Sequence, residues 1–171
     1  EMLMHSVLEA QRSDYIAEGS VSAGTRKDRL NRGVDVVLKY QDKMIDALNT
    51  DFSCRSREVT LLTAVAASIT PMKHAIKHLE KWMRSEKRAT MFPLNLLGGR
   101  STIEYQPLGV VGVISPWNFP VNLTFGPLAG ILAAGNRAMI KPSEFTPATS
   151  EVMAEMVAEA WDEKEVAIFT G

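Results

Sequence analysis

Residues Pro107–Pro147 read PLGVVGVISPWNFPVNLTFGPLAGILAAGNRAMIKPSEFTP and alternate short apolar runs with polar loops. The apolar run Gly109–Ile114 predicts a strand, Val121–Ala134 predicts a helix, and Ala138–Ile140 predicts a second strand. This order is typical of a parallel βαβ unit. Ligands of such sheets bind where loops leave the carboxyl ends of the strands, so the two loops that follow these strands form the expected site.

The flanking residues extend the same pattern. Thr146–Pro147 predicts the N-cap and first residue of another helix, and Glu165–Phe169 predicts a third strand. Apolar residues recur at helical spacing in 25–48 and in 61–83, which predicts helices packed on the sheet, with Pro71 kinking or dividing the second. The expected fold class is α/β: a partial parallel, Rossmann-like sheet preceded by an N-terminal helical region.

The composition is typical of a soluble globular domain. Of 171 residues, 46% are apolar and 23% charged, and 19 Lys/Arg nearly balance 20 Asp/Glu. The near-neutral charge predicts no nucleic-acid surface, no apolar run reaches the length of a membrane span, and the N-terminus lacks the features of a signal peptide. The single cysteine, Cys54, excludes an intrachain disulfide framework and indicates a reducing, cytoplasmic location.

The two loops carry a more specific pattern. PWNFP at 116–120, GN at 135–136 and KPSEFTP at 141–147 occur in this order at linked spacing. In these motifs the chain resembles the NAD(P)-dependent aldehyde dehydrogenase superfamily, in particular the class 3-like branch that includes the coniferyl aldehyde dehydrogenases. The resemblance covers most of the chain but only the N-terminal third of a family member.

The resemblance implies oxidation of an aldehyde to a carboxylic acid with NAD or NADP. In this family a cysteine thiolate adds to the carbonyl, hydride passes to the nicotinamide, and water hydrolyses the thioester. The implied substrate is an aromatic or medium-chain aldehyde, with coniferyl aldehyde as one candidate, and the implied assembly is a homodimer or homotetramer. We expect no nucleic-acid, membrane or metal partner within this chain.

Asn118 is the candidate catalytic residue. A side-chain amide on a loop at a strand end can donate to a developing oxyanion, which is worth roughly 3 kcal/mol of transition-state stabilisation. The alternative is an Asn that closes its own turn between two prolines. The residues alone favour the turn, whereas the resemblance implies that Asn118 holds the thiohemiacetal oxygen.

The expected cofactor residues fall in the same two loops. The resemblance implies that Ile114–Trp117 wall the nicotinamide side and that Lys141, Ser143 and Glu144 hold the adenosine ribose. A carboxylate can accept from the ribose 2′-hydroxyl, although a solvated Lys/Glu pair has the same composition. NAD and NADP both stay open, because a rotated carboxylate can admit the 2′-phosphate. The full set is Ile114, Ser115, Pro116, Trp117, Lys141, Ser143 and Glu144.

Three other reactive side chains do not point to a site. Cys54 lies between two predicted helices, well before the cofactor motifs, whereas a nucleophilic thiol needs an electropositive, positioned setting. His74 and His78 lie one turn apart on a helix, but no third metal ligand is nearby. We therefore expect a structural or surface thiol and no metal site.

The resemblance divides the chain into three regions. Residues 1–90 correspond to the helical N-terminal part of the cofactor domain, 91–107 to an extended arm used in subunit association, and 108–171 to the first part of the dinucleotide-binding domain. Within the arm, residues 92–100 predict an extended approach with a Gly-Gly turn and 101–106 a short strand.

The nucleophilic Cys, the general-base Glu and the helix that contacts the pyrophosphate come later in the family than Gly171. We therefore expect an incomplete chain that is inactive alone, exposes strand edges and self-associates. Two alternatives stay open: a CoA-acylating or reductive relative, and a non-catalytic nucleotide-binding or assembly module.

Overall fold

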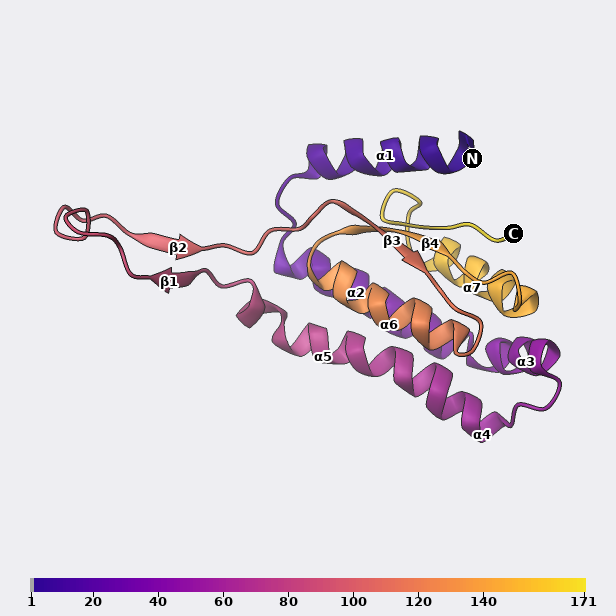
Figure 1. Cartoon of the computed structure of the whole chain (residues 1–171). Helices are drawn as coiled ribbons and strands as arrows, with labels where there is room; N and C mark the ends of the chain where they lie inside the picture. Colours follow the sequence, from indigo (N-terminus) through magenta and orange to yellow (C-terminus); the bar gives the residue numbers. More distant parts are fainter. Residues whose placement is uncertain (1) are drawn as a thin grey trace.

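A parallel sheet of three strands organises the C-terminal half of the chain (Figure 1). In the computed structural model, which describes residues 2–171, β3 (Val110–Ile114) pairs with β4 (Arg137–Lys141), and β4 pairs with β5 (Val166–Ile168). The register places Ile114 opposite Lys141. The predicted parallel sheet is confirmed, with strand ends shifted by at most one residue, and its carboxyl ends meet at one edge.

Two crossover helices pack on one face of this sheet. α6 (Pro120–Ala133) connects β3 to β4, and α7 (Pro147–Ala160) connects β4 to β5. Gly135 follows α6 with φ +85°, a left-handed conformation that favours glycine, so the predicted helix stop is confirmed. The strand residues that share the buried core with these helices are Val113, Ala138, Ile140 and Val166.

A second layer of helices covers the first. α2 (Ala23–Lys39) packs on α6, and α3 (Gln41–Phe52) packs on α7. The predicted helical stretch 25–48 is thus two helices, separated at Tyr40, which ends α2 and starts α3.

The other helix of this layer is a long rod that also packs on α2 and α6. It runs through α4 (Arg57–Thr60), the π-helical turn η1 (Leu61–Ala66) and α5 (Ala67–Trp82). Pro71 lies inside α5, so the helix is not divided at the proline, and the irregular winding precedes it. By length and composition alone, the whole rod, Arg57–Trp82, is long and apolar enough to cross a membrane. From the sequence we expected no apolar run of that length. Here the apolar side of the rod contributes to the core, as in a core helix of a soluble protein.

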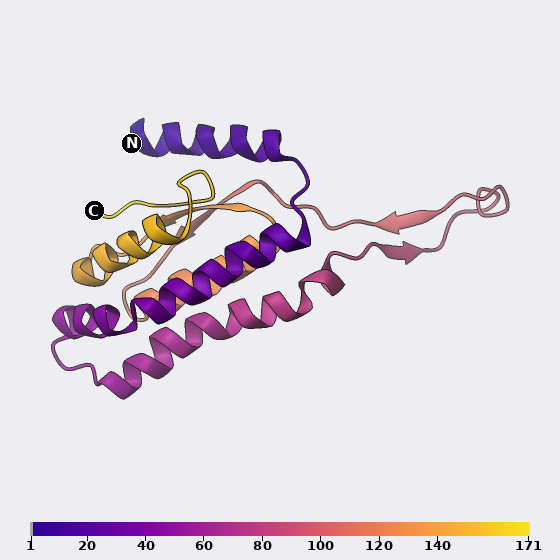
Figure 2. The same cartoon turned by 180° about the vertical axis from the view of Figure 1, so that it is seen from behind.

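α1 (Met2–Glu18) lies on the opposite face of the sheet (Figures 1 and 2). Gln11 donates its side-chain amide to the Ala138 carbonyl of β4 at 3.1 Å. Arg137 of β4, also buried, forms ion pairs with Asp14 and Glu18 of α1. These bonds fix α1 to the amino-terminal half of β4.

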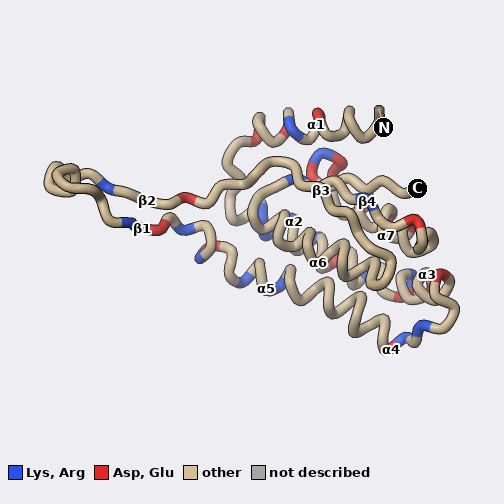
Figure 3. The backbone as a smooth tube through the Cα atoms, in the orientation of Figure 1, with Lys and Arg blue, Asp and Glu red and all other residues tan. Residues whose placement is uncertain are grey.

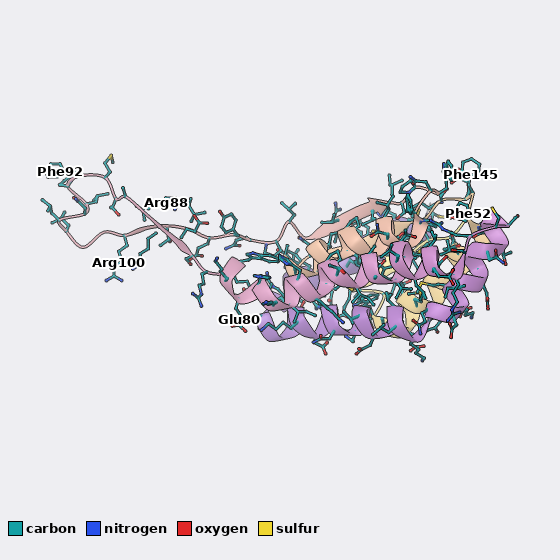
Figure 4. All side chains as sticks on the ribbon, turned by 90° about the horizontal axis from the view of Figure 1, so that it is seen from below. Phe52, Glu80, Arg88, Phe92, Arg100 and Phe145 are labelled. Atoms are coloured by element: carbon teal, nitrogen blue, oxygen red, sulfur yellow. The ribbon has the colours of Figure 1, made fainter. Side chains whose placement is uncertain are left out.

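A hairpin projects from the body between α5 and β3 (Figures 1 and 4). β1 (Glu86–Arg88) pairs antiparallel with β2 (Ser101–Ile103). The predicted strand at 101–106 is therefore present but shorter, while 92–98, expected to be extended, forms turns. Lys/Arg and Asp/Glu are interspersed along the chain (Figure 3). Exposed apolar side chains at the hairpin tip are Met91, Phe92, Leu94, Leu96 and Leu97.

Candidate functional site

The loops that follow β3 and β4 lie side by side at the carboxyl edge of the sheet. The Ser115 backbone N–H donates to the Lys141 carbonyl at 3.0 Å, which continues the pairing of β3 and β4 into the loops. The structure therefore brings together the two groups of residues predicted from PWNFP and KPSEFTP.

The β3–α6 loop presents its apolar side chains outward. Ile114 is 90% exposed and Trp117 is 53% exposed, and Pro116 is exposed as well. Ser115 differs, because its side chain is buried and its Oγ lies 2.7 Å from Thr124 Oγ1 of α6. The Ser115 hydroxyl is therefore part of the fold, and only its backbone is left for a ligand.

Asn118 is exposed and lies two residues before α6. Within residues 2–171 its side-chain amide has no hydrogen-bond partner. The structure thus gives no support to an Asn that closes its own turn. The amide N–H groups are free to donate to a ligand.

The β4–α7 loop is more polar and more tightly bonded. Lys141 Nζ donates to the neighbouring Pro142 carbonyl at 2.8 Å, and Ser143 Oγ accepts from the Phe145 backbone N–H at 3.2 Å. Ser143 is buried, whereas Glu144 is exposed. Lys141 and Glu144 can therefore reach a ligand, while the Ser143 hydroxyl shapes the loop.

Asp51 is a residue that sequence reasoning missed. Thr146 occupies the N-cap position of α7, as predicted, but its side chain makes no capping bond. Instead the Asp51 carboxylate accepts from the backbone N–H groups of Ala148 at 3.1 Å and Thr149 at 2.8 Å. The predicted N-cap position of Thr146 and the proline at the start of α7 are therefore confirmed, but the capping hydrogen bonds come from Asp51. No local signal reveals Asp51, because it precedes its partners by 97 and 98 residues.

Arg55 was missed for the same reason. Its guanidinium lies 4.8 Å from the centre of the Phe52 ring and 5.2 Å from that of Phe119, which belongs to PWNFP. Burial lowers the pKa of Arg55, although the side chain stays charged. A desolvated cation over aromatic rings is a stabilising contact, so Arg55 ties the β3–α6 loop to the turn after α3.

An apolar hollow of about 540 Å³ adjoins the Asn118 loop. One wall comes from the π-helical turn and the start of α5, and the other from the residues that follow Asn118. A π-helical turn is common at functional sites. The lining residues are Leu62, Thr63, Ala66, Ala67, Thr70, Pro71, Phe119 and Asn122.

A larger groove of about 680 Å³ lies at the base of the hairpin, between Trp82 and Ala133. None of the predicted site residues lines it. Size alone favours this groove as a ligand site, but the donors and acceptors of the two loops are at the carboxyl edge. We therefore assign the candidate site to that edge.

The remaining reactive side chains lie elsewhere. Cys54 is an exposed free thiol in the turn after α3. The rings of His74 and His78 stack with centres 4.1 Å apart, and Trp82 follows them on α5. In the part of the chain that the structure describes, no three His, Cys, Asp or Glu side chains are grouped to hold a metal.

The residues at the edge fit a dinucleotide. Exposed Ile114 and Trp117 offer apolar contacts to a planar ring, and Lys141 and Glu144 offer a donor and an acceptor for ribose hydroxyls. Beside them, a Cβ added at Gly112 of β3 would have no atom within 4 Å, so this face of the sheet leaves room for a ligand.

Comparison with known proteins identifies the family of the chain. The model of the aldehyde dehydrogenase family matches residues 4–170. A probable coniferyl aldehyde dehydrogenase of Caulobacter vibrioides is 55% identical over 99% of this chain and 35% of its own length. The coniferyl aldehyde dehydrogenase of Pseudomonas sp. strain HR199 is 46% identical over 97% of this chain and 34% of its own. The chain thus spans about a third of the length of these relatives.

Solved structures show the same fold. The chain superposes on Staphylococcus aureus AldH in a substrate-bound state with a TM-score of 0.91 at 28% identity, covering 98% of this chain and 36% of AldH. The aldehyde dehydrogenase KauB of Pseudomonas aeruginosa gives a TM-score of 0.83 at 23% identity, covering 98% of this chain and 33% of KauB. Fold, loop geometry and family match agree, and the chain belongs to the aldehyde dehydrogenase family.

Proposed function

We propose that this chain supplies the oxyanion donor and the cofactor-binding loops of an NAD(P)-dependent enzyme that oxidises an aromatic or medium-chain aldehyde to a carboxylic acid. The observation that carries the proposal is the exposed, unbonded amide of Asn118 beside the Lys141–Glu144 loop. The names of the two relatives above favour coniferyl aldehyde as the substrate.

Each loop has a distinct role in this proposal. Asn118 donates to the oxygen that becomes negative when the nucleophile adds to the aldehyde, and this lowers the barrier to addition. Ile114 and Trp117 pack against the nicotinamide, while Lys141 and Glu144 hold the adenosine ribose. Ser115, Pro116 and Ser143 shape the two loops. NAD or NADP, when bound, supplies the hydride acceptor.

The nucleophilic Cys and the general-base Glu of the family fall outside residues 1–171 in this proposal. Cys54 is not the nucleophile in this proposal, because it precedes the two loops in sequence, whereas the nucleophile of the family follows them. The apolar hollow beside Phe119 suits the hydrocarbon part of an aldehyde whose oxygen is held by Asn118.

Assembly and location complete the proposal. An exposed hairpin with an apolar tip needs a partner surface, which favours a homodimer or homotetramer. A free thiol at Cys54 is compatible with a reducing cytoplasm.

The test uses the protein in its full natural length. NAD(P)H formation from coniferyl aldehyde is followed for the unsubstituted protein, for Asn118→Ala and for Asn49→Ala, which removes an exposed amide from α3. We expect Asn118→Ala to lower kcat by about 100- to 1000-fold because an oxyanion donor is lost. Asn49→Ala should leave kcat unchanged.

Three outcomes would redirect the assignment. Equal kcat values in the two variants would remove Asn118 from the reaction. Nucleotide binding without turnover of any aldehyde would favour a non-catalytic binding module. Release of an acyl-CoA rather than an acid when CoA is added would favour the CoA-acylating relative.

A further inference from the structure

The end of α3 contacts the start of α7, and the turn that follows α3 contacts the β3–α6 loop. Asp51 and Phe52 end α3, and Arg55 lies in the turn itself. Figure 4 shows Phe52 at the same end of the molecule as Phe145 of the β4–α7 loop, opposite the hairpin. One short segment, remote from the sheet in sequence, therefore reaches the two loops that carry the site.

Asp51 anchors the far end of the β4–α7 loop. The N–H groups of Ala148 and Thr149, which bond to its carboxylate, have no partner inside α7, and the helix dipole favours a negative charge at this position. The near end of the loop is anchored by β4, whose last residue is Lys141. Glu144 thus lies between two fixed points, one of which Asp51 provides.

Arg55 anchors the other loop through its contact with the Phe119 ring. Phe119 directly follows Asn118 and is the N-cap residue of α6, where it makes no side-chain capping bond. The buried Ser115 side chain and the Ser115 backbone N–H fix the start of this loop, and Arg55 contacts its last residue. The contact therefore restricts where the Asn118 amide can lie.

We propose that Asp51 and Arg55 are positioning residues, and that the segment 51–55 is a brace that sets the separation between Asn118 and Glu144. The inference rests on the proposed function, in which these two residues hold the oxyanion and the ribose in one complex. The brace acts only through geometry, since neither Asp51 nor Arg55 belongs to a loop of the site. Geometry is sufficient, because a displacement of about 1 Å can lower a rate by about 100-fold.

The two anchors should affect different kinetic constants. In the full-length protein, Arg55→Ala is expected to lower kcat by about 10- to 100-fold, with the Kd for NAD changed by less than about twofold. Asp51→Ala is expected to raise the Kd for NAD by about 5-fold, the equivalent of one lost helix cap, with kcat at saturating NAD nearly unchanged. Arg55→Lys and Asp51→Asn should restore part of each loss, because a cation and one acceptor oxygen remain.

Matched controls exist in the two helices that flank the turn. Asp42 of α3 and Arg57 of α4 form an ion pair on the surface, with side chains 71% and 54% exposed. Asp42→Ala and Arg57→Ala remove the same side-chain types close to the brace. Both should leave kcat and the Kd for NAD at their original values.

Amide hydrogen exchange tests the brace without a catalytic readout. Exchange should accelerate in peptides covering 142–150 for Asp51→Ala and in peptides covering 115–124 for Arg55→Ala, and in neither region for the controls. The brace is overturned if both substitutions change exchange, kcat and Kd no more than the controls do. If the unsubstituted protein neither binds NAD nor oxidises an aldehyde while these exchange changes occur, the proposed function fails and the brace stands.

Discussion

At the amino end of the sheet charged side chains bind one another, whereas at the carboxyl end they face solvent. Arg137 is 1% exposed, and its guanidinium bonds to Asp14 and Glu18 of α1. Arg29 of α2 then connects Glu18 to Glu165, which directly precedes β5. At this end of the sheet, a network of ion pairs therefore connects α1 and α2 with the start of β4 and the residue before β5.

At the carboxyl end of the sheet, the polar side chains of the described residues do not form ion pairs with one another. Asn118 and Glu144 are exposed, and across residues 2–171 neither Lys141 nor Glu144 forms an ion pair. The comparison indicates a division of labour: charges at the amino end stabilise the fold, and donors and acceptors at the carboxyl end are available to a ligand. Substitutions at the two ends should therefore change different properties.

The largest expected effect comes from breaking the amino-end network at its centre. Arg137→Met leaves Asp14 without its buried partner and leaves Glu18 with Arg29 alone, and we expect a loss of about 3 kcal/mol in the free energy of unfolding. The loss should lie at the low end for a buried pair, because both carboxylates are about one-third exposed. Urea unfolding measures it, and NAD binding should be unchanged at low denaturant.

Arg12→Met is the matched control on the same helix. Arg12 pairs with Glu9 on the surface of α1, with both side chains more than half exposed, and such pairs contribute about 0–1 kcal/mol. Equal losses for Arg12→Met and Arg137→Met would contradict the view that the buried network stabilises this end of the sheet.

A pH effect should arise from Glu165. Burial by itself raises the pKa of Glu165, but hydrogen bonds from Arg32 and Arg29 outweigh it and bring the pKa below its ordinary value. Because the folded pKa is below the unfolded value of about 4.3, the contribution of Glu165 is complete above about pH 5 and is lost as pH falls through the folded pKa.

Urea midpoints between pH 7 and pH 3 check this expectation. The unsubstituted protein should lose stability below about pH 4.3, and Glu165→Gln should show a weaker dependence on pH. Glu163→Gln, an exposed residue of the same turn, should follow the unsubstituted protein. Parallel curves for all three proteins would show that Glu165 does not stabilise the fold through its charge.

The sequence predicted best what depends on neighbouring residues. The apolar runs around Val113 and Ile140 were sufficient to place two parallel strands, because strands buried in a parallel sheet are continuously apolar. Gly135 was sufficient to end α6. Consecutive strands joined by a helix are usually neighbours in a parallel sheet. The loops that follow β3 and β4 were therefore expected to lie side by side, and they do.

Long-range competition explains what the sequence did not reveal. Thr146 is a good N-cap by type, but a full carboxylate at Asp51 is a stronger acceptor at a helix N-terminus than a hydroxyl. β1 has the sequence EKR, without apolar alternation, and its strand exists only because β2 pairs with it. Pro71 did not divide the rod, because packing on α2 and α6 holds the helix together.

The smallest stability effect is expected at the carboxyl end, where Glu144→Gln sharpens the comparison. Glu144 is exposed, so unfolding should change by less than about 0.5 kcal/mol. Its carboxylate is proposed to accept from the ribose 2′-hydroxyl, so the Kd for NAD should rise by about 10-fold, as for a lost hydrogen bond to a charged group. NADP carries a phosphate there, so its Kd should change less or fall.

Glu151→Gln is the matched control, because Glu151 is an exposed carboxylate on α7. Isothermal titration with NAD and with NADP gives both constants for each variant. A Kd for NAD that is unchanged in Glu144→Gln would remove Glu144 from the ribose site. A large loss of stability in Glu144→Gln would instead mean that the carboxyl end, like the amino end, uses its charges to hold the fold.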